Sequence, residues 1–489
     1  MNSTELNSKR NNYVAVIGLE VHAQLATQTK AWCHCEVTAH ALENTKVCEV
    51  CSAQPGTLPV LNKKVVEFAS KMAMATHCKI NDLSFFDRKN YFYPDLPKGY
   101  QISQFETPLA QDGYVEITNA NGELKKIRIE RIQIEEDTGK STHEGEMSLI
   151  NLNRAGTPLI EIVGKPDIET AEEASSYLKQ LHSILTYLGV CHGNLQEGNF
   201  RCDVNVSIHK KGTNVWGTRT ETKNLNSFKH VEKAIENEIE RQVEILESGE
   251  KVIQQTLGFD PETLKVKVLR TKSDAHDYRY FPEPDLIPLV ITEQEKTKWM
   301  NELPELPKVK QERFVQDYSL PVYDAEVLTA DKNLAHYFEQ VVKNYKGEPK
   351  KASNWIMVEL LRLLNEFNID VQKSPVSDFE LAELLNAVFE GKISGKQAKD
   401  VFIKMFDEKK GALEVIKELG LVQISDTSAL KELAEKLVAA HPTQTEQYLS
   451  GKDRLFGFFV GLVMKETKGQ ANPQVANDVM LEVLNKLKK

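Results

Sequence analysis

The sequence lacks any apolar run long enough to cross a membrane. The best candidate, Leu455 to Met464, is about half of the roughly 20 residues that a bilayer requires. Its Gly457-x-x-x-Gly461 spacing instead predicts a helix that packs closely against a neighbour. The first ten residues are polar and lack the apolar centre of a signal peptide. We therefore expect a cytoplasmic protein with no membrane segment and with reduced thiols.

The chain also lacks the glycine-rich loops that usually hold nucleotide phosphates. Neither a Gly-x-x-x-x-Gly-Lys-[Ser/Thr] loop nor a kinase-type glycine loop is present. If the protein uses ATP, it binds the nucleotide in an unusual fold. The net charge of −10 argues against charge-driven nucleic-acid binding over the whole surface, but it leaves room for a local basic patch.

A chain of 489 residues is too long for one hydrophobic core, so we expect two or three domains. Residues 1–303 show strand-like alternation, turns rich in Gly and Asn, and few long helices. Pro304 and Pro307 then discourage both helix and central strand, and helical patterns follow them. We place a helical domain at 304–410 and a small tail domain at 411–489.

Two helices of the second part have clear start signals. Ser377 and Glu380 have capping-box spacing, and so do Ser394 and Gln397. Each box precedes an apolar stripe at helical spacing. The two stripes are Leu381, Leu384, Leu385, Val388 and Phe389, and then Ala398, Val401, Phe402, Met405 and Phe406.

Four of the seven cysteines form a metal-binding pattern. Cys33-x-Cys35 and Cys48-x-x-Cys51 are separated by twelve residues, so two tight turns can place four sulfurs around one ion. Zn²⁺ suits four thiolates, and the full ligand set predicts a structural role. Disulfides are the alternative, which the absence of a secretion signal disfavours. The other cysteines are expected to be small core residues: Cys78, Cys191 and Cys202.

Three segments alternate between apolar and polar residues as strands do. From Ile17 to Leu25 the odd positions are apolar, which leaves Glu20, His22 and Gln24 on the opposite face. The polar positions of the other two segments are Arg201, Asp203, Asn205 and Ser207, and Arg219, Glu221 and Lys223. One such face alone is typical of the wet side of an antiparallel sheet.

A fourth segment changes its phase. Between Ile129 and Ile132 the apolar period shifts, which predicts a bulge that re-aims the acidic run Glu135 to Asp137. Carboxylates on several strands, mixed with Arg, Lys and Asn, are what a Mg²⁺-nucleotide site requires. Hard oxygen ligands hold the ion, and cations neutralise charge on the transferring phosphoryl group.

The segment Ser84 to Gln104 is too polar for a core and too aromatic for a disordered linker. Its prolines and Gly99 fix the backbone, as expected of a rigid loop that contacts a ligand, and an aromatic-packed surface turn is the alternative. Within it, Phe86-Asp-Arg-Lys-Asn-Tyr-Phe-Tyr-Pro-Asp-Leu-Pro-Lys-Gly-Tyr-Gln101 resembles a signature of the B subunit of the bacterial aspartyl/glutamyl-tRNA(Asn/Gln) amidotransferase. Further segments share the resemblance: 17–25, 55–62, 135–140, 153–163, 201–206, 223–228 and 277–286.

The resemblance implies an α+β protein, with an antiparallel-sheet cradle domain, an all-helical domain and a small helical tail that binds tRNA. It implies ATP-dependent amidation of misacylated Glu-tRNA(Gln) or Asp-tRNA(Asn), in which this protein phosphorylates the side-chain carboxylate. The chain shows no amidase Ser or glutaminase Cys arrangement, so ammonia must come from a partner. In the family, an amidase partner called the A subunit provides the ammonia, and a small C subunit wraps both.

The resemblance also assigns residues. Four would hold Mg²⁺ or its water shell, two more lie close behind them, and four would contact substrate or phosphate. The residues that would hold Mg²⁺ are Glu20, His22, Glu135 and Glu161, and those close behind them are Glu136 and Asp203. The residues that would contact substrate or phosphate are Lys89, Tyr91, Arg154 and Asn205.

Two hypotheses from other classes compete with this one. A non-catalytic, zinc-containing protein that binds tRNA or assists assembly would explain the cysteines and the tail, but not the carboxylates on several strands. An ATP-dependent small-molecule ligase is the third hypothesis, and its substrate is undefined. ATP hydrolysis that requires misacylated tRNA would separate the three.

Overall fold

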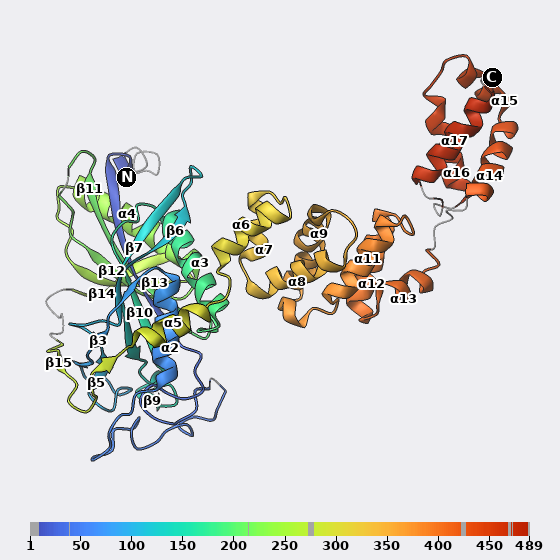
Figure 1. Ribbon diagram of the computed structural model, residues 1–489. Coiled ribbons are helices and arrows are strands. Elements are labelled where there is room, and N and C mark those ends of the chain that lie inside the picture. The colour runs from blue at the N-terminus through green and yellow to red at the C-terminus, as the bar shows by residue number, and fades with distance from the viewer. Residues whose placement is uncertain are drawn as a thin grey trace. The chain divides into compact units, whose positions relative to one another are not determined.

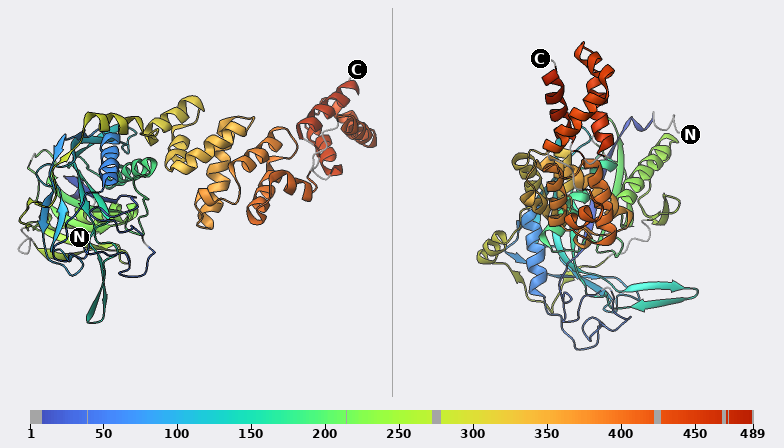
Figure 2. Two further views of the ribbon diagram at one scale, coloured as in Figure 1. Left: turned by 60° about the horizontal axis from the view of Figure 1, so that its bottom comes forward. Right: turned by 90° about the vertical axis from the view of Figure 1, so that its right-hand side faces the viewer.

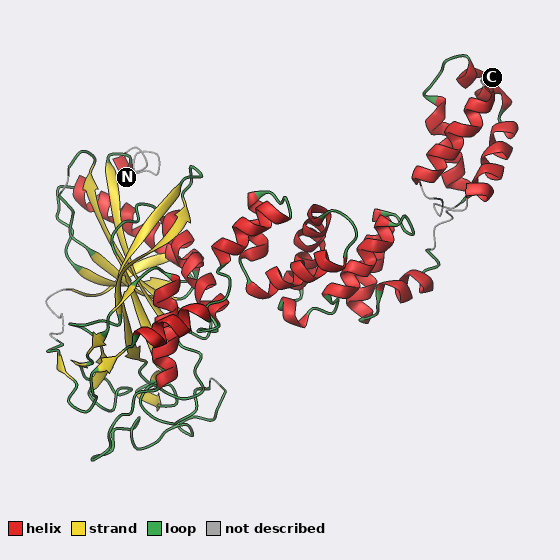
Figure 3. Cartoon of the chain, viewed as in Figure 1, coloured by secondary structure: helices red, strands yellow, loops and turns green. Residues whose placement is uncertain are grey.

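The computed structural model describes residues 9–38, 40–213, 215–271, 278–421, 427–467, 471 and 473–487. The chain forms two compact units, Met1–Pro307 and Lys308–Lys489 (Figure 1). Strands lie in the first unit, and the described part of the second is helical (Figure 3). This confirms the predicted α+β class. No helix among the described residues is long and apolar enough to cross a membrane.

A nine-stranded sheet organises the first unit, in the order β14-β13-β12-β11-β1-β10-β7-β6-β2. Its neighbouring strands are antiparallel, except for the parallel pair β12 and β13. The strands are β1 (Tyr13–Gln24), β2 (Lys79–Ile80), β6 (Ala110–Thr118), β7 (Leu124–Glu136), β10 (Pro158–Gly164), β11 (Phe200–Lys210), β12 (Thr220–Leu225), β13 (Gln255–Asp260) and β14 (Lys265–Thr271).

Three small sheets accompany the large one. They pair β15 (Phe281–Pro282) with β4 (Asp87–Asn90) and β5 (Tyr100–Ser103), β16 (Leu289–Val290) with β3 (Leu83–Ser84), and β8 (Lys140–Glu144) with β9 (Met147–Asn151). Figure 2 shows the β8–β9 hairpin extending away from the large sheet.

Helices cover the apolar face of the large sheet. They are α2 (Lys63–Ala75), α3 (Ala171–Leu188) and α4 (Phe228–Glu247), and α5 (Glu293–Asn301) packs against α2. Helix α3 contacts β6 and α4 contacts β11, and their apolar residues share one core with β1. Thr170 caps the start of α3, and Gly189 ends it in the left-handed conformation. Helices α3 and α4 differ from the expectation of few long helices in this part of the chain.

The second unit contains two separate cores. The first is formed by α6 (Pro307–Asp317), α7 (Val322–Thr329), α8 (Lys332–Asn344), α9 (Pro349–Trp355), the π-helix η2 (Ile356–Leu360), α10 (Leu361–Glu366), the 3₁₀-helix η3 (Val371–Lys373), α11 (Asp378–Phe389), α12 (Gly395–Glu408) and α13 (Ala412–Glu418). The second is formed by α14 (Thr427–Ala440), α15 (Pro442–Leu449), α16 (Leu455–Glu466) and α17 (Pro473–Leu487).

Both predicted capping boxes are present, at the starts of α11 and α12. The α12 stripe is buried as predicted, whereas Phe389 at the end of the α11 stripe is 54% exposed. Helix α13 packs in the first of the two cores, although the sequence analysis began the tail at residue 411. The predicted close packing of Gly457 and Gly461 is wrong for the part of the chain that the structure describes, where a Cβ added at either residue would meet nothing within 4 Å.

Candidate functional site

The polar face of the large sheet brings carboxylates together from adjacent strands. Along β1 the burial alternates as predicted, with Ile17, Leu19 and Val21 in the core. Cross-strand register then pairs His22 with Glu161 on β10. On the other side of β1 it pairs Glu20 with Asp203 on β11. Because paired side chains on one face are close neighbours, β1 supplies one residue to each of two acidic groups.

The first group, the His22 cluster, consists of His22, Glu135 and Glu161, and its ligand atoms lie within 4.8 Å of one another. Gln133 joins the two carboxylates, donating to Glu135 at 2.9 Å and to Glu161. The Ser103 hydroxyl also donates to Glu135, at 2.5 Å. The Nε2 atom of His22 lies 3.6 Å from Glu161, and its buried Nδ1 has no hydrogen-bond partner among the described residues. A lone pair or proton at that atom is therefore available to a ligand.

Charge in the His22 cluster is balanced by Lys89. Burial and the neighbouring Glu135 raise the pKa of Glu161 to about 8. Burial also acts to raise the pKa of Glu135, but Lys89 and His22 outweigh it and lower that pKa. Burial opposes the charge of Lys89, yet Glu135 and other anionic neighbours raise its pKa. Two carboxylates this close repel when both are ionised, so the cluster favours a cation between them.

The second group, the Glu20 cluster, consists of Glu20, Asp203 and Glu221, again with ligand atoms within 4.8 Å. Asn205 donates to Glu20 at 2.9 Å, and Lys223 contacts Asp203 at 2.9 Å and Glu221 at 2.8 Å. Burial and the two neighbouring carboxylates raise the pKa of Glu20. Carboxylate oxygens are the protein ligands that Mg²⁺ takes, with waters and phosphate oxygens completing its coordination.

The structure separates other residues that the sequence analysis grouped with these. Glu136 is held by other partners: its Oε1 accepts hydrogen bonds from the Lys98 ammonium and from the Ile102 amide. Glu136 belongs to neither acidic cluster of the described residues. The bulge predicted in β7 is present, since the β7–β10 register shifts between Val163 and Gly164. Residues 135–137 are all buried beyond it.

Asp137 and Arg154 lie at the end of the same face. Arg201 donates to Asp137 at 3.0 Å, and Gln24 donates to it at 2.7 Å. Burial acts to raise the pKa of Asp137, but Arg201 and Arg154 lower it. Arg154 donates to the carbonyl oxygens of Thr138 and Gly139, so part of its guanidinium is already engaged.

Aromatic residues of the Ser84–Gln104 segment lie beside Lys89. The Lys89 ammonium lies 5.1 Å from the ring centre of Tyr278, and Tyr278 contacts the rings of Tyr91 and Tyr280. The Tyr91 hydroxyl donates to Gln101 at 3.2 Å. Tyr278 thus links the half-buried Lys89 to Tyr91 of this segment, and Asp277, which begins the segment 277–286, is outside the described residues.

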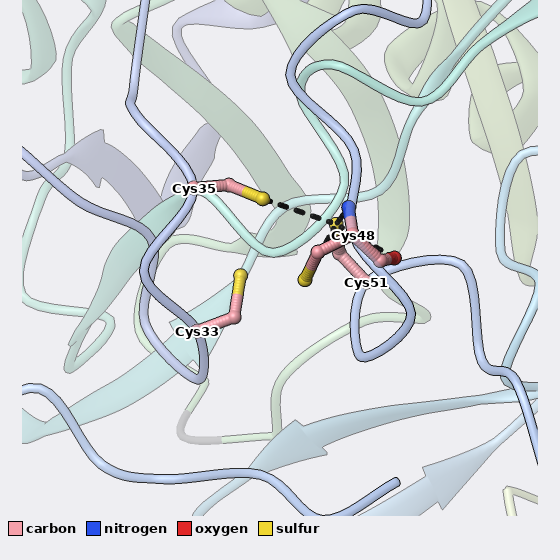
Figure 4. A group of neighbouring side chains, drawn as sticks. All are labelled: Cys33, Cys35, Cys48 and Cys51. Carbon is pink, nitrogen blue, oxygen red and sulfur yellow. Dashed lines mark hydrogen bonds between the residues drawn. The ribbon is translucent and has the colours of Figure 1, made fainter.

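The four cysteines predicted to bind metal converge, with sulfur atoms within 4.8 Å of one another (Figure 4). Cys51 lies 4.0 Å from Cys35 and 3.8 Å from Cys48, measured between sulfurs. The pKa of the Cys51 thiol is lowered, mainly by its hydrogen bond with Cys33. Burial acts to raise this pKa, whereas the Cys48 amide and Lys30 lower it further. The donor set fits a tetrahedral thiolate metal centre. Cys78, Cys191 and Cys202 are buried, as predicted.

Several contributing residues escaped the sequence analysis. Glu221 had been placed on a polar strand face but not assigned to the site, since its meeting with Glu20 depends on the strand order β12-β11-β1. Gln133 and Ser103 orient Glu135; Gln133 belongs to no motif, and Ser103 lies in the Ser84–Gln104 segment without any pattern that marks it individually. Ser103 reaches Glu135 because β5 lies beside β7.

Comparisons with known proteins cover nearly the whole chain. A family model described as the GatB/GatE catalytic domain matches residues 15–297, and one described as the GatB domain matches 336–484. Among curated relatives, the aspartyl/glutamyl-tRNA(Asn/Gln) amidotransferase B subunit of Thermodesulfovibrio yellowstonii is 50% identical over 473 residues, 96% of this chain and 99% of that protein. The proteins of the same name from Geotalea uraniireducens and Persephonella marina are 51% and 49% identical, covering 97% and 96% of this chain and 99% of each relative.

Proposed function

The chain belongs to the GatB family, the B subunits of aspartyl/glutamyl-tRNA(Asn/Gln) amidotransferase, and we propose that the polar face of its large sheet carries the chemistry. The enzyme converts misacylated Glu-tRNA(Gln) or Asp-tRNA(Asn) into the amide form. A carboxylate resists attack by ammonia, because its negative charge makes the carbon a poor electrophile. One carboxylate oxygen therefore attacks the γ-phosphorus of ATP and ADP leaves. Ammonia then attacks the acyl carbon, and phosphate leaves with the C–O bonding electrons.

The observation that supports this proposal is the pair of acidic clusters on one face of adjacent strands. We assign one Mg²⁺ to His22, Glu135 and Glu161, and a second to Glu20, Asp203 and Glu221. Both sets fit a divalent cation: His22 Nε2 lies 3.6 Å from Glu161 in the first set, and burial together with neighbouring carboxylates raises the pKa of Glu161 in the first set and of Glu20 in the second. When bound, such ions neutralise charge on the phosphate oxygens. The resemblance implies one Mg²⁺ ligand set of Glu20, His22, Glu135 and Glu161. Under this proposal the set is divided, because Glu20 falls in one cluster and the other three residues in the other.

Positively charged and polar residues beside the clusters are assigned to the substrate. Lys89 is half-buried beside the His22 cluster, where its ammonium attracts the substrate carboxylate or the transferring phosphoryl group. Tyr91 flanks Lys89. Asn205 orients Glu20, and Arg154 borders the same face beside Asp137. Each of these residues binds or orients, and the reacting bonds belong to ATP, the aminoacyl group and ammonia.

The remaining parts are assigned by the resemblance. Ammonia comes from the amidase partner, the small C subunit completes a cytoplasmic heterotrimer, and the tail binds tRNA. The sheet domain, proposed at residues 1–303, holds structural Zn²⁺ at its four cysteines. The helical domain follows at 304–410 and the tail at 411–489, although the packing of α13 favours a tail that starts after Leu421.

ATP turnover by the reconstituted three-subunit complex tests this function. We expect hydrolysis to require misacylated tRNA and to yield Gln-tRNA(Gln) or Asn-tRNA(Asn) in equal amount. Correctly charged Gln-tRNA(Gln) serves as the control, because it has no carboxylate to phosphorylate. ATP turnover that is the same with both tRNAs would favour the hypothesis of a non-catalytic protein.

A further inference from the structure

Lys30 is a fully buried lysine beside the cysteine cluster. Its ammonium donates to the Lys46 carbonyl at 2.9 Å, to the Cys51 sulfur at 3.4 Å and to the Leu152 carbonyl at 3.4 Å. No carboxylate is among these three partners. Because a buried cation is costly without a counter-charge, the Cys51 thiolate is the one partner here that can compensate Lys30.

The same lysine also contacts the turn that leads back into the large sheet. The Ala31 amide donates to the Gly156 carbonyl at 2.9 Å, and the Gly156 amide donates to the Asp137 carbonyl at 2.9 Å. Gly156 has a φ of +82°, and a Cβ added there would lie 3.6 Å from the Lys30 side chain and 3.8 Å from Glu136. Gly156 therefore lies close to Lys30 on one side and to Glu136, at the end of β7, on the other.

A second set of contacts joins this turn to the segment that carries the four cysteines, residues 33–51, which we call the cysteine segment. The Lys46 amide donates to the Asn153 side chain at 2.9 Å, and Asn153 in turn donates to the Leu42 carbonyl at 2.7 Å. The residue after Asn153 is Arg154, whose guanidinium lies 3.8 Å from Asp137. Movement of the cysteine segment would thus displace Arg154.

We propose that Lys30 is a positioning residue that couples metal occupancy of the four cysteines to the placement of Arg154. The inference rests on the proposed zinc site. Four thiolates around Zn²⁺ carry a net charge of −2, and the buried ammonium compensates part of it while donating a hydrogen bond to one ligand. Groups that hydrogen-bond to metal ligands orient them and tune the metal. The same ammonium donates to the Leu152 carbonyl, at the start of the turn of Leu152 to Thr157, and to the Lys46 carbonyl between the two cysteine pairs, so it links the turn to the cysteines.

Cobalt substitution of the full-length chain, assembled with its partner proteins, tests this role. Lys30→Met keeps the length of the side chain and removes its charge. We expect Co²⁺ affinity to fall roughly 10- to 100-fold, and the sulfur-to-cobalt charge-transfer band to shift, because the thiolate loses a donor. The KM for aminoacyl-tRNA should rise while the glutaminase activity of the partner stays unchanged.

Lys46→Met is the matched control. Its ammonium pairs with the exposed Glu36 at 2.6 Å and makes no contact with a cysteine sulfur among the described residues. This variant should keep wild-type cobalt affinity and spectrum. If wild type itself binds neither Zn²⁺ nor Co²⁺, the proposed zinc site fails. If wild type binds metal and Lys30→Met matches Lys46→Met in affinity and spectrum, the role of Lys30 is refuted.

If Lys30→Met does not fold, amide hydrogen exchange measured on the wild-type complex tests the same coupling. Removal of the metal by a chelator should speed exchange at the Ala31 and Gly156 amides, since both lie on the path from the cysteines to Asp137. Exchange at the buried β1 amides, such as that of Val21, serves as the internal reference. Unchanged exchange at Ala31 and Gly156 after complete metal removal would contradict the coupling.

Discussion

The two units of this chain differ in how deeply many of their acidic side chains are buried. In the sheet unit, Glu135, Asp137 and Asp203 are 1%, 2% and 6% exposed. In the helical unit, pairs such as Lys346–Glu390 and Lys404–Glu418 lie at the surface. Exposed pairs contribute little to stability, whereas buried charges are costly and are retained where specific partners or chemistry require them. The buried acids are therefore consistent with the proposal that the sheet unit performs the reaction.

One carboxylate in the helical unit sharpens the contrast. Asp324 is 5% exposed, but it is satisfied by Lys350 and by the Ser353 hydroxyl, each at 2.5 Å. No second carboxylate joins it in a metal-binding group of the described residues. A buried acid alone is thus compatible with a structural role. The clustering of several acids on adjacent strands is what distinguishes the sheet.

The largest change of stability is expected at the cysteines. The variant Cys48→Ser/Cys51→Ser removes two thiolates, so the sheet unit should lose its zinc and a large part of the free energy of folding that metal binding supplies. Metal analysis should fall from one zinc per chain to none, and the thermal transition of the sheet unit should move to lower temperature. A double variant that keeps its zinc would contradict the assignment.

Removal of the tail should separate binding from chemistry. A chain ending at Leu421 keeps α13 in its own core and lacks α14 to α17. The KM for aminoacyl-tRNA should rise about tenfold, which corresponds to about 1.4 kcal/mol of binding. The ATP requirement and the glutaminase activity of the partner should persist. An unchanged KM would refute tRNA binding by the tail.

The smallest effect is expected from a polar residue of the helical unit. Ser377→Ala removes the hydroxyl that caps α11 and should cost about 1 kcal/mol of the free energy of unfolding. Denaturant unfolding measures this change. Because Ser377 belongs to neither acidic cluster, kcat for amidation should stay at the wild-type value. A substantial loss of kcat would break the contrast between the units.

Local patterns in the sequence predicted part of this structure. Alternation placed Glu20 and His22 on the polar face of β1, and two capping boxes placed the starts of α11 and α12. These features depend on neighbours within a few residues. The division of the acids into two clusters depends instead on strand order and register, which no local pattern contains.

Two errors have the same origin. The Gly457 and Gly461 spacing predicts a close helix contact, but whether a partner helix lies there depends on tertiary packing, and here none approaches among the described residues. Phe389 follows the apolar period of α11 yet is exposed, because the core ends before the helix does. Periodicity identifies the face that a helix offers to a core and does not show how far the core extends.

The substitution Glu135→Gln tests most directly whether the sheet unit performs the reaction. It keeps the volume and removes the charge that faces Lys89 and His22. Phosphorylation of aminoacyl-tRNA by the reconstituted complex should fall by at least ~10²-fold, the scale of losing one electrostatic stabiliser. Glutamine hydrolysis by the partner should be spared. Glu130→Gln, on the same strand with a half-exposed side chain, is the control and should retain activity. Near-normal tRNA-dependent ATP turnover in Glu135→Gln would contradict the placement of the active site on this face.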